Sequence, residues 1–202
     1  MRTAIIPFFM ILTVSHMAHA ESDATCEARA GKPQPTILQR SYEAKLHPLK
    51  VCTGKPVDDR SACNRFVGKA LFELFNNTDF KVGSDEFMVA NNIANGLIMP
   101  GNAGWTLVGL AADQASLDKA QKLANEGKQV VAARSESGKA GHVALILPGQ
   151  LEESTDTPKG WSGLKSPNSA AFLLDRAEKA YVGCPLAFAG WKNPKGVKIY
   201  FK

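Results

Sequence analysis

The clearest pattern of hydrophobic and polar positions lies between residues 61 and 75. Its apolar members fall at i, i+3, i+4, i+7, i+8, i+11 and i+12, which is one face of a helix held over three turns. They are Cys63, Phe66, Val67, Ala70, Leu71, Leu74 and Phe75. Ser61 or Asp59 is a natural N-cap, and Asn76-Asn77 ends the run. The pattern therefore predicts a helix with Cys63 in its first turn, on the inward face.

Two more helices are predicted, over Asp85–Ala94 and Ser116–Asn125, the second stopped by Gly127. After them the hydrophobic period changes from 3.6 to 2. Strands follow, and the segments with this pattern are Gln129–Ala133, His142–Leu147, Ala170–Leu174, Leu186–Ala189 and Val197–Phe201. Because helices come first and an antiparallel sheet is expected to follow, the predicted fold class is α+β.

The first 20 residues have the pattern of a cleavable secretory signal peptide. Met1-Arg2 gives a charged start, an apolar run extends from Ala4 to Val14, and Ala18-His19-Ala20 precedes Glu21. A membrane-spanning helix needs about 20 apolar residues, so this run predicts export without a membrane anchor, with a retained signal-anchor as the alternative. We expect three parts: the signal peptide 1–20, an irregular N-terminal wrap over 21–57, and one domain over 58–202.

The charge of the chain excludes little. The signal peptide carries one charge, Arg2, so its removal changes the formal net charge from +5 to +4. The basic residues are spread out and do not alternate with aromatic residues, so a nucleic-acid partner is not predicted. Attraction to an anionic envelope polymer is compatible with this charge but is not indicated by it.

Cysteine and histidine are the residues that bear on chemistry. Four cysteines in an oxidising compartment suggest two disulfides, which can be connected in three ways. The structural interpretation of each cysteine is therefore that it belongs to one of these disulfides. Cys63 has another interpretation, because a helix N-terminus stabilises a thiolate. An imidazole partner would have to be His47 or His142, since the other two histidines leave with the signal peptide. His142 is favoured because it begins a strand directly after Gly141, although a structural histidine explains it equally well.

Two blocks of sequence resemble the papain-like cell-wall amidohydrolases, the NlpC-like and CHAP-like families. The first is Ser61-Ala62-Cys63-Asn64-Arg65-Phe66-Val67, which is similar to their nucleophile helix. The second is Gly127–Ala132, a seven-residue turn and Gly141–Ile146, similar to their core hairpin with its strand headed by Gly-His-Val. The histidine follows the cysteine by 79 residues, in the order of these families. Ala62 departs from the acidic residue usual before the cysteine, and the 76–114 insert is similar to that of divergent amidases that bacteria deliver into competitors.

The resemblance implies a papain-like fold and specific roles. Cys63 would be the nucleophile, His142 the general base, and the backbone N–H of Cys63 part of an oxyanion hole. For the polar residue that orients the imidazole we choose Asn168, with Ser169 and Glu153 behind it, and Tyr42 could reach the oxyanion. With Cys63 a free thiolate, we expect a Cys26–Cys52 disulfide and a buried, unpaired Cys184. Trp105 and Trp161 lie in glycine-bearing loops, where they would either bind substrate or belong to the core.

The resulting hypothesis is an exported cysteine amidohydrolase that cuts amide bonds in the peptide stems or cross-links of peptidoglycan. It implies no cofactor and no metal, because two histidines make no zinc motif. The resemblance to delivered amidases also implies a cognate immunity or inhibitor protein as a partner. The main alternative is a secreted binding or structural protein whose four cysteines are all paired. A third keeps the papain-like fold with another acyl acceptor, such as a protein or lipid amine.

Overall fold

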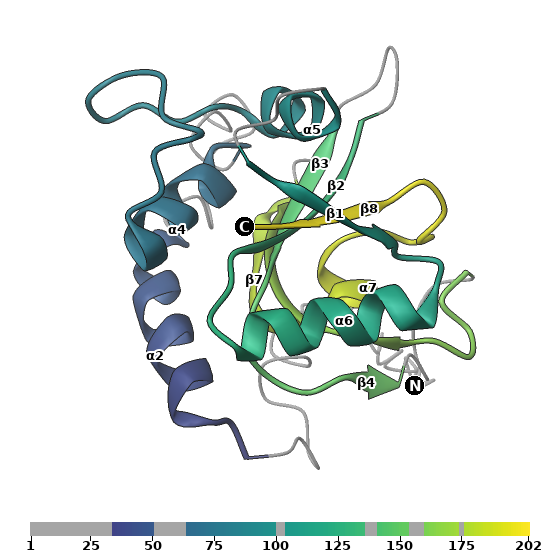
Figure 1. Ribbon diagram of the computed structural model, residues 1–202. Coiled ribbons are helices and arrows are strands. Elements are labelled where there is room, and N and C mark those ends of the chain that lie inside the picture. The colour runs from purple at the N-terminus through teal and green to yellow at the C-terminus, as the bar shows by residue number, and fades with distance from the viewer. Residues whose placement is uncertain (1–33, 51–63, 100–103, 136–140, 154–159, 174–175) are drawn as a thin grey trace, which may run out of the picture.

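The computed structural model describes residues 34–50, 64–99, 104–135, 141–153, 160–173 and 176–202. The predicted signal peptide and three of the four cysteines, Cys26, Cys52 and Cys63, lie outside these residues. Within them, helices pack on both faces of an antiparallel sheet (Figure 1). The predicted α+β class is confirmed.

The sheet has six strands in the order β1-β8-β2-β3-β6-β7, and every neighbouring pair is antiparallel. The strands are β1 Thr106–Leu110, β2 Val130–Arg134, β3 His142–Ile146, β6 Asn168–Leu173, β7 Arg176–Pro185 and β8 Lys198–Phe201. A second, two-stranded sheet pairs β4, Glu152–Glu153, with β5, Lys165–Ser166. The core hairpin predicted from the change of period is therefore present as β2 and β3, which pair along their whole length.

Helices cover the two faces of the sheet separately. They are α2 Ile37–Leu46, the 3-10 helix η1 His47–Leu49, α4 Phe66–Phe75, α5 Ala90–Ile98, α6 Gln114–Asn125 and α7 Leu186–Ala189. One hydrophobic cluster joins α2, α4 and α5 to one face, and a second joins α6 and α7 to the other. The side chains of β3 alternate between the two clusters: Val143 and Leu145 belong to the first, and Ala144 and Ile146 to the second. Because both faces are covered, β2 and β3 are apolar on both sides rather than alternating with polar residues.

Helix α4 confirms the most periodic segment of the sequence from Phe66 onward. It begins at Phe66 with Arg65 as its N-cap, so the predicted N-caps Ser61 and Asp59 are wrong, and Cys63 is not part of its first turn. Phe66, Val67, Ala70 and Leu71 are buried, and the chain leaves the helix through Asn76 at φ 54°. That left-handed conformation is one that asparagine tolerates, and it ends the helix where predicted. Helix α6 also agrees with its prediction, apart from starting two residues earlier behind the side-chain cap of Asp113.

The helix predicted over 85–94 is wrong in its first half. Residues 80–88 form a small hairpin instead, in which Val82 N–H donates to Glu86 O at 2.9 Å and Met88 N–H donates to Phe80 O at 2.8 Å. A backbone that pairs in this way has no donors and acceptors left for a helix. Helix α5 begins at Ala90 instead.

Three other elements differ from the sequence prediction. The irregular wrap predicted over 21–57 contains the helix α2, whose N-cap Thr36 accepts from Gln39 N–H at 3.1 Å. Leu186–Ala189, predicted as a strand, is the helix α7, since Pro185 ends β7 directly before it. Strand β1 lies in the segment that appeared only glycine-rich, and it pairs with β8 through a register shift between Leu107 and Gly109.

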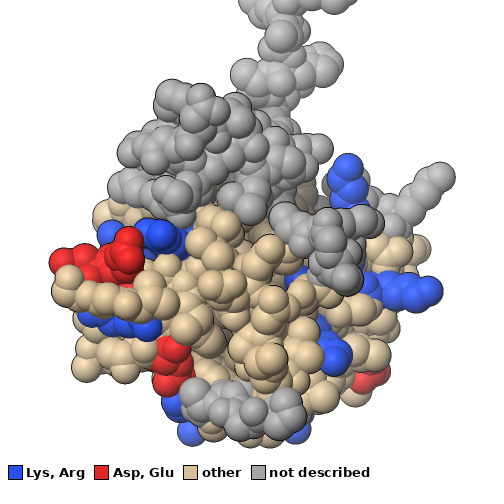
Figure 2. All heavy atoms as spheres, turned by 90° about the horizontal axis from the view of Figure 1, so that it is seen from above, with Lys and Arg blue, Asp and Glu red and all other residues tan. Residues whose placement is uncertain are grey.

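Charged side chains are dispersed on the described part of one face of the molecule. Figure 2 shows Lys and Arg scattered over the described part of one face, in single positions and small groups rather than in a stripe.

Asp79 connects three parts of the chain beyond α4. Its carboxylate accepts hydrogen bonds from Trp105 Nε1 at 2.9 Å, Lys202 Nζ at 2.8 Å and Asn77 Nδ2 at 3.2 Å. Burial by itself would raise the pKa of this carboxyl, but the hydrogen bonds and the charge of Lys202 outweigh it, and the pKa is lowered.

Replacing Asp79 by asparagine is expected to lower the free energy of unfolding by about 1 kcal/mol at neutral pH. A carboxyl whose folded-state pKa is lowered stabilises the fold above its unfolded-state pKa, and this contribution is lost as the pH falls through the folded-state value. Urea unfolding of wild type and Asp79→Asn should therefore differ fully near neutrality and converge in acid. Asp85→Asn, at an exposed position in the hairpin, is the control. A difference that does not depend on pH would contradict this account.

Candidate active site

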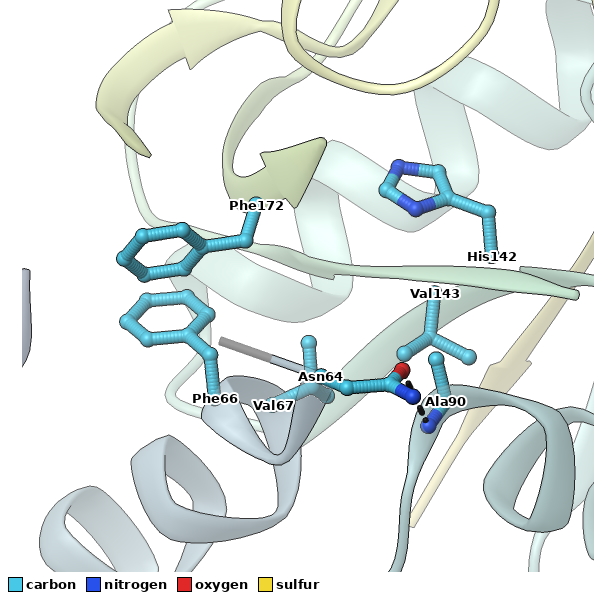
Figure 3. A pocket seen from close by; sticks show the side chains of 7 residues that line it. All are labelled: Asn64, Phe66, Val67, Ala90, His142, Val143 and Phe172. Carbon is cyan, nitrogen blue, oxygen red and sulfur yellow. Dashed lines mark hydrogen bonds between the residues drawn. The ribbon is translucent and has the colours of Figure 1, made fainter. Parts of the chain in front are cut away.

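A small pocket lies where the N-terminal end of α4 meets the first residues of β3. Two aromatic rings form one wall, with Phe66 of α4 and Phe172 of β6 edge-to-face at 4.8 Å between centroids. The residues that line the pocket are Asn64, Phe66, Val67, Ala90, His142, Val143 and Phe172 (Figure 3). His142 is the only titratable residue among these seven. The pocket therefore contains the predicted general base and Asn64, the residue that follows the predicted nucleophile.

Asn64 holds the entrance to α4 in place. Its Oδ1 accepts a hydrogen bond from Ala90 N–H, the first backbone donor of α5, at 3.0 Å (Figure 3). Val89, the residue before α5, has no side-chain cap of its own, so Asn64 satisfies this donor from another part of the chain. Cys63 itself lies outside the described residues. Helix α4 begins three residues after it, at Phe66, so the predicted position of Cys63 in the first turn of this helix is not borne out.

His142 is the first residue of β3, and its ring lies on the face opposite α4. Figure 3 shows the imidazole on one side of the β3 ribbon and Val143 and Asn64 on the other. The ring meets Trp191 edge-on, with centroids 4.8 Å apart and an angle of 71°. Arg134 is the direct cross-strand neighbour of His142, and its Nη1 contacts the carbonyls of Asn193 and Lys195 at 3.4 Å. The loop after α7 therefore covers His142 on this face.

Asn168 is not brought to His142. It lies at the other end of β3, where Leu147 N–H donates to Asn168 O at 2.9 Å. Its Nδ2 donates to Pro148 O at 2.8 Å, and its backbone N–H donates to Gln121 Oε1 at 2.8 Å. Five residues of extended chain span about 16 Å, so Asn168 cannot orient the imidazole. This choice of the third residue is corrected.

Neither of the two residues considered in place of Asn168 lies where it could orient the imidazole of His142. Ser169 Oγ donates to Cys184 O at 2.8 Å inside the sheet. Glu153 lies in β4 and is exposed, 3.6 Å from Lys165 Nζ.

Tyr42 packs edge-on against Phe75, and burial raises the pKa of its hydroxyl. Phe75 is the last residue of α4, whereas the pocket lies at the first, so Tyr42 is about 14 Å from the pocket along the helix axis. The prediction that Tyr42 reaches the oxyanion is therefore wrong.

Both candidate substrate-binding tryptophans belong to the core. Trp105 is buried between the sheet and Phe80, and its Nε1 donates to Asp79. Trp161 is fully buried in the α6–α7 cluster, and its Nε1 donates to Trp191 O at 2.7 Å. Neither lines the pocket, so the loop position of a tryptophan is explained here by packing and not by ligand binding.

Cys184 corrects the predicted disulfide pattern. It is fully buried in β7, as expected, but it is disulfide-bonded and not a free thiol. Its partner lies outside the described residues, as do both members of the predicted Cys26–Cys52 bridge. A Cys26–Cys52 bridge and a paired Cys184 together would leave only Cys63 as the partner, so the state of Cys63 decides whether the site holds a nucleophile.

Comparison with models of known protein families finds no match, and comparison with curated proteins finds no relative. Among the described residues no group of three or more His, Cys, Asp or Glu is arranged to hold a metal ion. None of the described helices is long and apolar enough to cross a membrane.

Sequence reasoning missed three contributors to this site. Ala90 and Phe172 come from elements whose bounds were wrong or only approximate, and Trp191 comes from a loop without a pattern. Asn64 was visible in the motif directly after Cys63, but nothing in the local sequence separates it from the neighbouring polar residues such as Arg65.

Proposed function

We propose that the chain is an exported cysteine amidohydrolase with a papain-like arrangement, acting on amide bonds of peptidoglycan peptides. The observation that supports it is the pocket that contains both His142 and Asn64, the residue after Cys63. Helix α4 packs against β3 and β6, so the helix that Cys63 precedes lies directly on the strand that His142 begins. Cysteine on a helix entrance and histidine on the adjacent strand are the pairing that thiol catalysis requires.

The proposed reaction needs only the chemistry of these two side chains. His142 takes the proton from Cys63 Sγ, the thiolate attacks the amide carbon, and the C–N bond breaks as the imidazolium returns the proton to the leaving amine. Water, deprotonated by the same imidazole, then hydrolyses the thioester. Because the ring packs on Trp191, on the face opposite α4, a side-chain rotation alone does not bring it to Cys63. The first step therefore requires the backbone at His142, the first residue of β3, to change conformation so that the ring reaches the pocket.

The substrate class is supported by the export signal and by the resemblance of both sequence blocks to cell-wall amidohydrolases. Peptidoglycan is the amide-rich polymer that an exported bacterial-type amidase meets. An immunity or inhibitor protein that covers the pocket would be its cognate partner, and no membrane anchor or cofactor is part of the proposal.

Two observations favour a second candidate, a secreted, disulfide-stabilised binding or structural protein. Cys184 is disulfide-bonded, and His142 packs on Trp191 like a core histidine. In that case Cys63 would be paired and the pocket would have no nucleophile. The two candidates therefore differ in one covalent fact, the state of the Cys63 thiol.

The deciding experiment maps the disulfides of the mature, unreduced protein by mass spectrometry and digests purified peptidoglycan with the same preparation. A free Cys63, with fragments that carry a newly released amino group, is the expected result. A bridge between Cys63 and Cys184, together with no fragments after mild reduction, would establish the second candidate. Fragments with cleaved glycosidic bonds would contradict both.

A further inference from the structure

We propose that Asn91 is a positioning residue that sets the separation between the two catalytic side chains, a role that rests on the proposed function. Asn91 acts through the backbone before His142, while its neighbour Ala90 is held to the residue after Cys63. The N-terminal end of α5 is thus a clamp, made of Asn64, Ala90, Asn91 and Gly141.

The first half of the clamp is the hydrogen bond from Ala90 N–H to Asn64 Oδ1, at 3.0 Å. Ala90 is buried and Asn64 half-buried, so water competes poorly for this bond. It fixes the residue that follows Cys63 to the first turn of α5.

The second half is a hydrogen bond from Gly141 N–H to Asn91 Oδ1. Gly141 is buried and directly precedes His142, so this bond fixes the start of β3 to the same helical turn. A side chain at residue 141 has no room, because a Cβ there would lie 2.9 Å from Asn91 Oδ1 and 3.3 Å from Asn91 Cα. Glycine at this position is explained by the close approach of α5 to the strand end.

The helix that carries both bonds is itself held firmly. Its inward residues Ala90, Ile93, Ala94 and Leu97 are buried in the α2–α4–α5 cluster. One turn beyond Asn91, Asn95 Oδ1 accepts from Ser135 Oγ at 2.5 Å, beside the end of β2. Adjacent residues of a rigid helix therefore connect the segment after Cys63 to the segment before His142, by one hydrogen bond on each side.

This connection matters for catalysis because proton transfer between thiol and imidazole depends steeply on their distance. A displacement of about 1 Å is enough to cost on the order of 100-fold in rate. Removing the acceptor of Asn91 removes the hydrogen bond that ties Gly141 to α5, while the pocket walls from α4 and β6 stay in place.

The test compares Asn91→Leu, which removes the acceptor, with Asn91→Asp, which keeps a side-chain oxygen at the same position. Asn92→Leu is the matched control, since Asn92 is the exposed neighbour on the same helix. We expect Asn91→Leu to lower kcat for amide release by roughly 10- to 100-fold with KM changed less than about twofold. Asn91→Asp should restore most of kcat, and Asn92→Leu should match wild type. Equal kcat for wild type and Asn91→Leu, or an equal loss in all three variants, would overturn the proposal.

Amide hydrogen exchange of Gly141 provides a readout that does not need activity. Exchange should be faster in Asn91→Leu and close to wild type in Asn91→Asp and Asn92→Leu. If wild type released no fragments, the proposed function would fail while this measurement still tested the clamp. Unchanged exchange in Asn91→Leu would overturn the clamp even in an active enzyme. If Asn91→Leu did not fold, Asn91→Ser would replace it, because a shorter side chain does not reach Gly141.

Discussion

Cys63→Ala is expected to reduce amide release from peptidoglycan by at least about 1,000-fold. The reason is that no other group among the pocket residues can form the acyl-enzyme: their only titratable side chain is His142. His142→Ala should lose nearly as much, because the thiol would then lack the base that activates it. The two losses should not add, since both residues serve one step. Initial rates of new amino groups, with fragments identified by mass, measure both.

The controls for this result are chosen to separate chemistry from folding. His47→Ala removes the other histidine among the described residues, which lies exposed in η1, and should leave the rate unchanged. Far-UV circular dichroism and the unfolding midpoint of Cys63→Ala should match wild type if the cysteine is a free thiol. An unfolding midpoint that falls in both Cys63→Ala and Cys63→Ser would indicate that the replacement removes a disulfide. Full activity in Cys63→Ala would exclude the thiol mechanism outright.

Trp161→Ala should lower the free energy of unfolding by about 3–5 kcal/mol, the range for truncating a large aromatic side chain in a core. Trp161 is 0% exposed, packs in the α6–α7 cluster, and donates from Nε1 to Trp191 O at 2.7 Å. The truncation would leave a large cavity and a buried carbonyl without its donor. Urea unfolding followed by circular dichroism measures the loss. A loss of this size is a large fraction of the total free energy of unfolding of a domain.

Trp161→Phe separates packing from the hydrogen bond. Phenylalanine keeps most of the buried ring but donates nothing, so a smaller loss of roughly 1–3 kcal/mol is expected. KM for peptidoglycan fragments should not change, because the ring does not line the pocket. A raised KM with unchanged stability would instead support the substrate-binding role that the loop position of Trp161 suggested.

The sequence by itself determined the elements whose residues carry their own periodic signal. Helix α4 has three turns of apolar residues on one face and an asparagine stop, and both are local properties of the chain. The same holds for α6 with its Asp113 cap, and for the hairpin of β2 and β3, whose apolar runs are long enough to be strands buried on both sides. These elements together carry the α+β class. The candidate pair Cys63 and His142 came from motif order, before any geometry.

Only the tertiary structure decided where polar and aromatic side chains lie relative to one another. Asn168 looked available to His142, but the antiparallel register of β3 with β6 places it at the far end of the strand. Helix α5 begins at Ala90 because Asn64, distant in sequence, accepts from its first N–H, and such a cap leaves no local pattern. The face on which His142 packs, the burial of Trp161 and the disulfide of Cys184 depend likewise on which segments meet in space. Periodicity reports burial of a face, whereas register and long-range hydrogen bonds decide which side chains become neighbours.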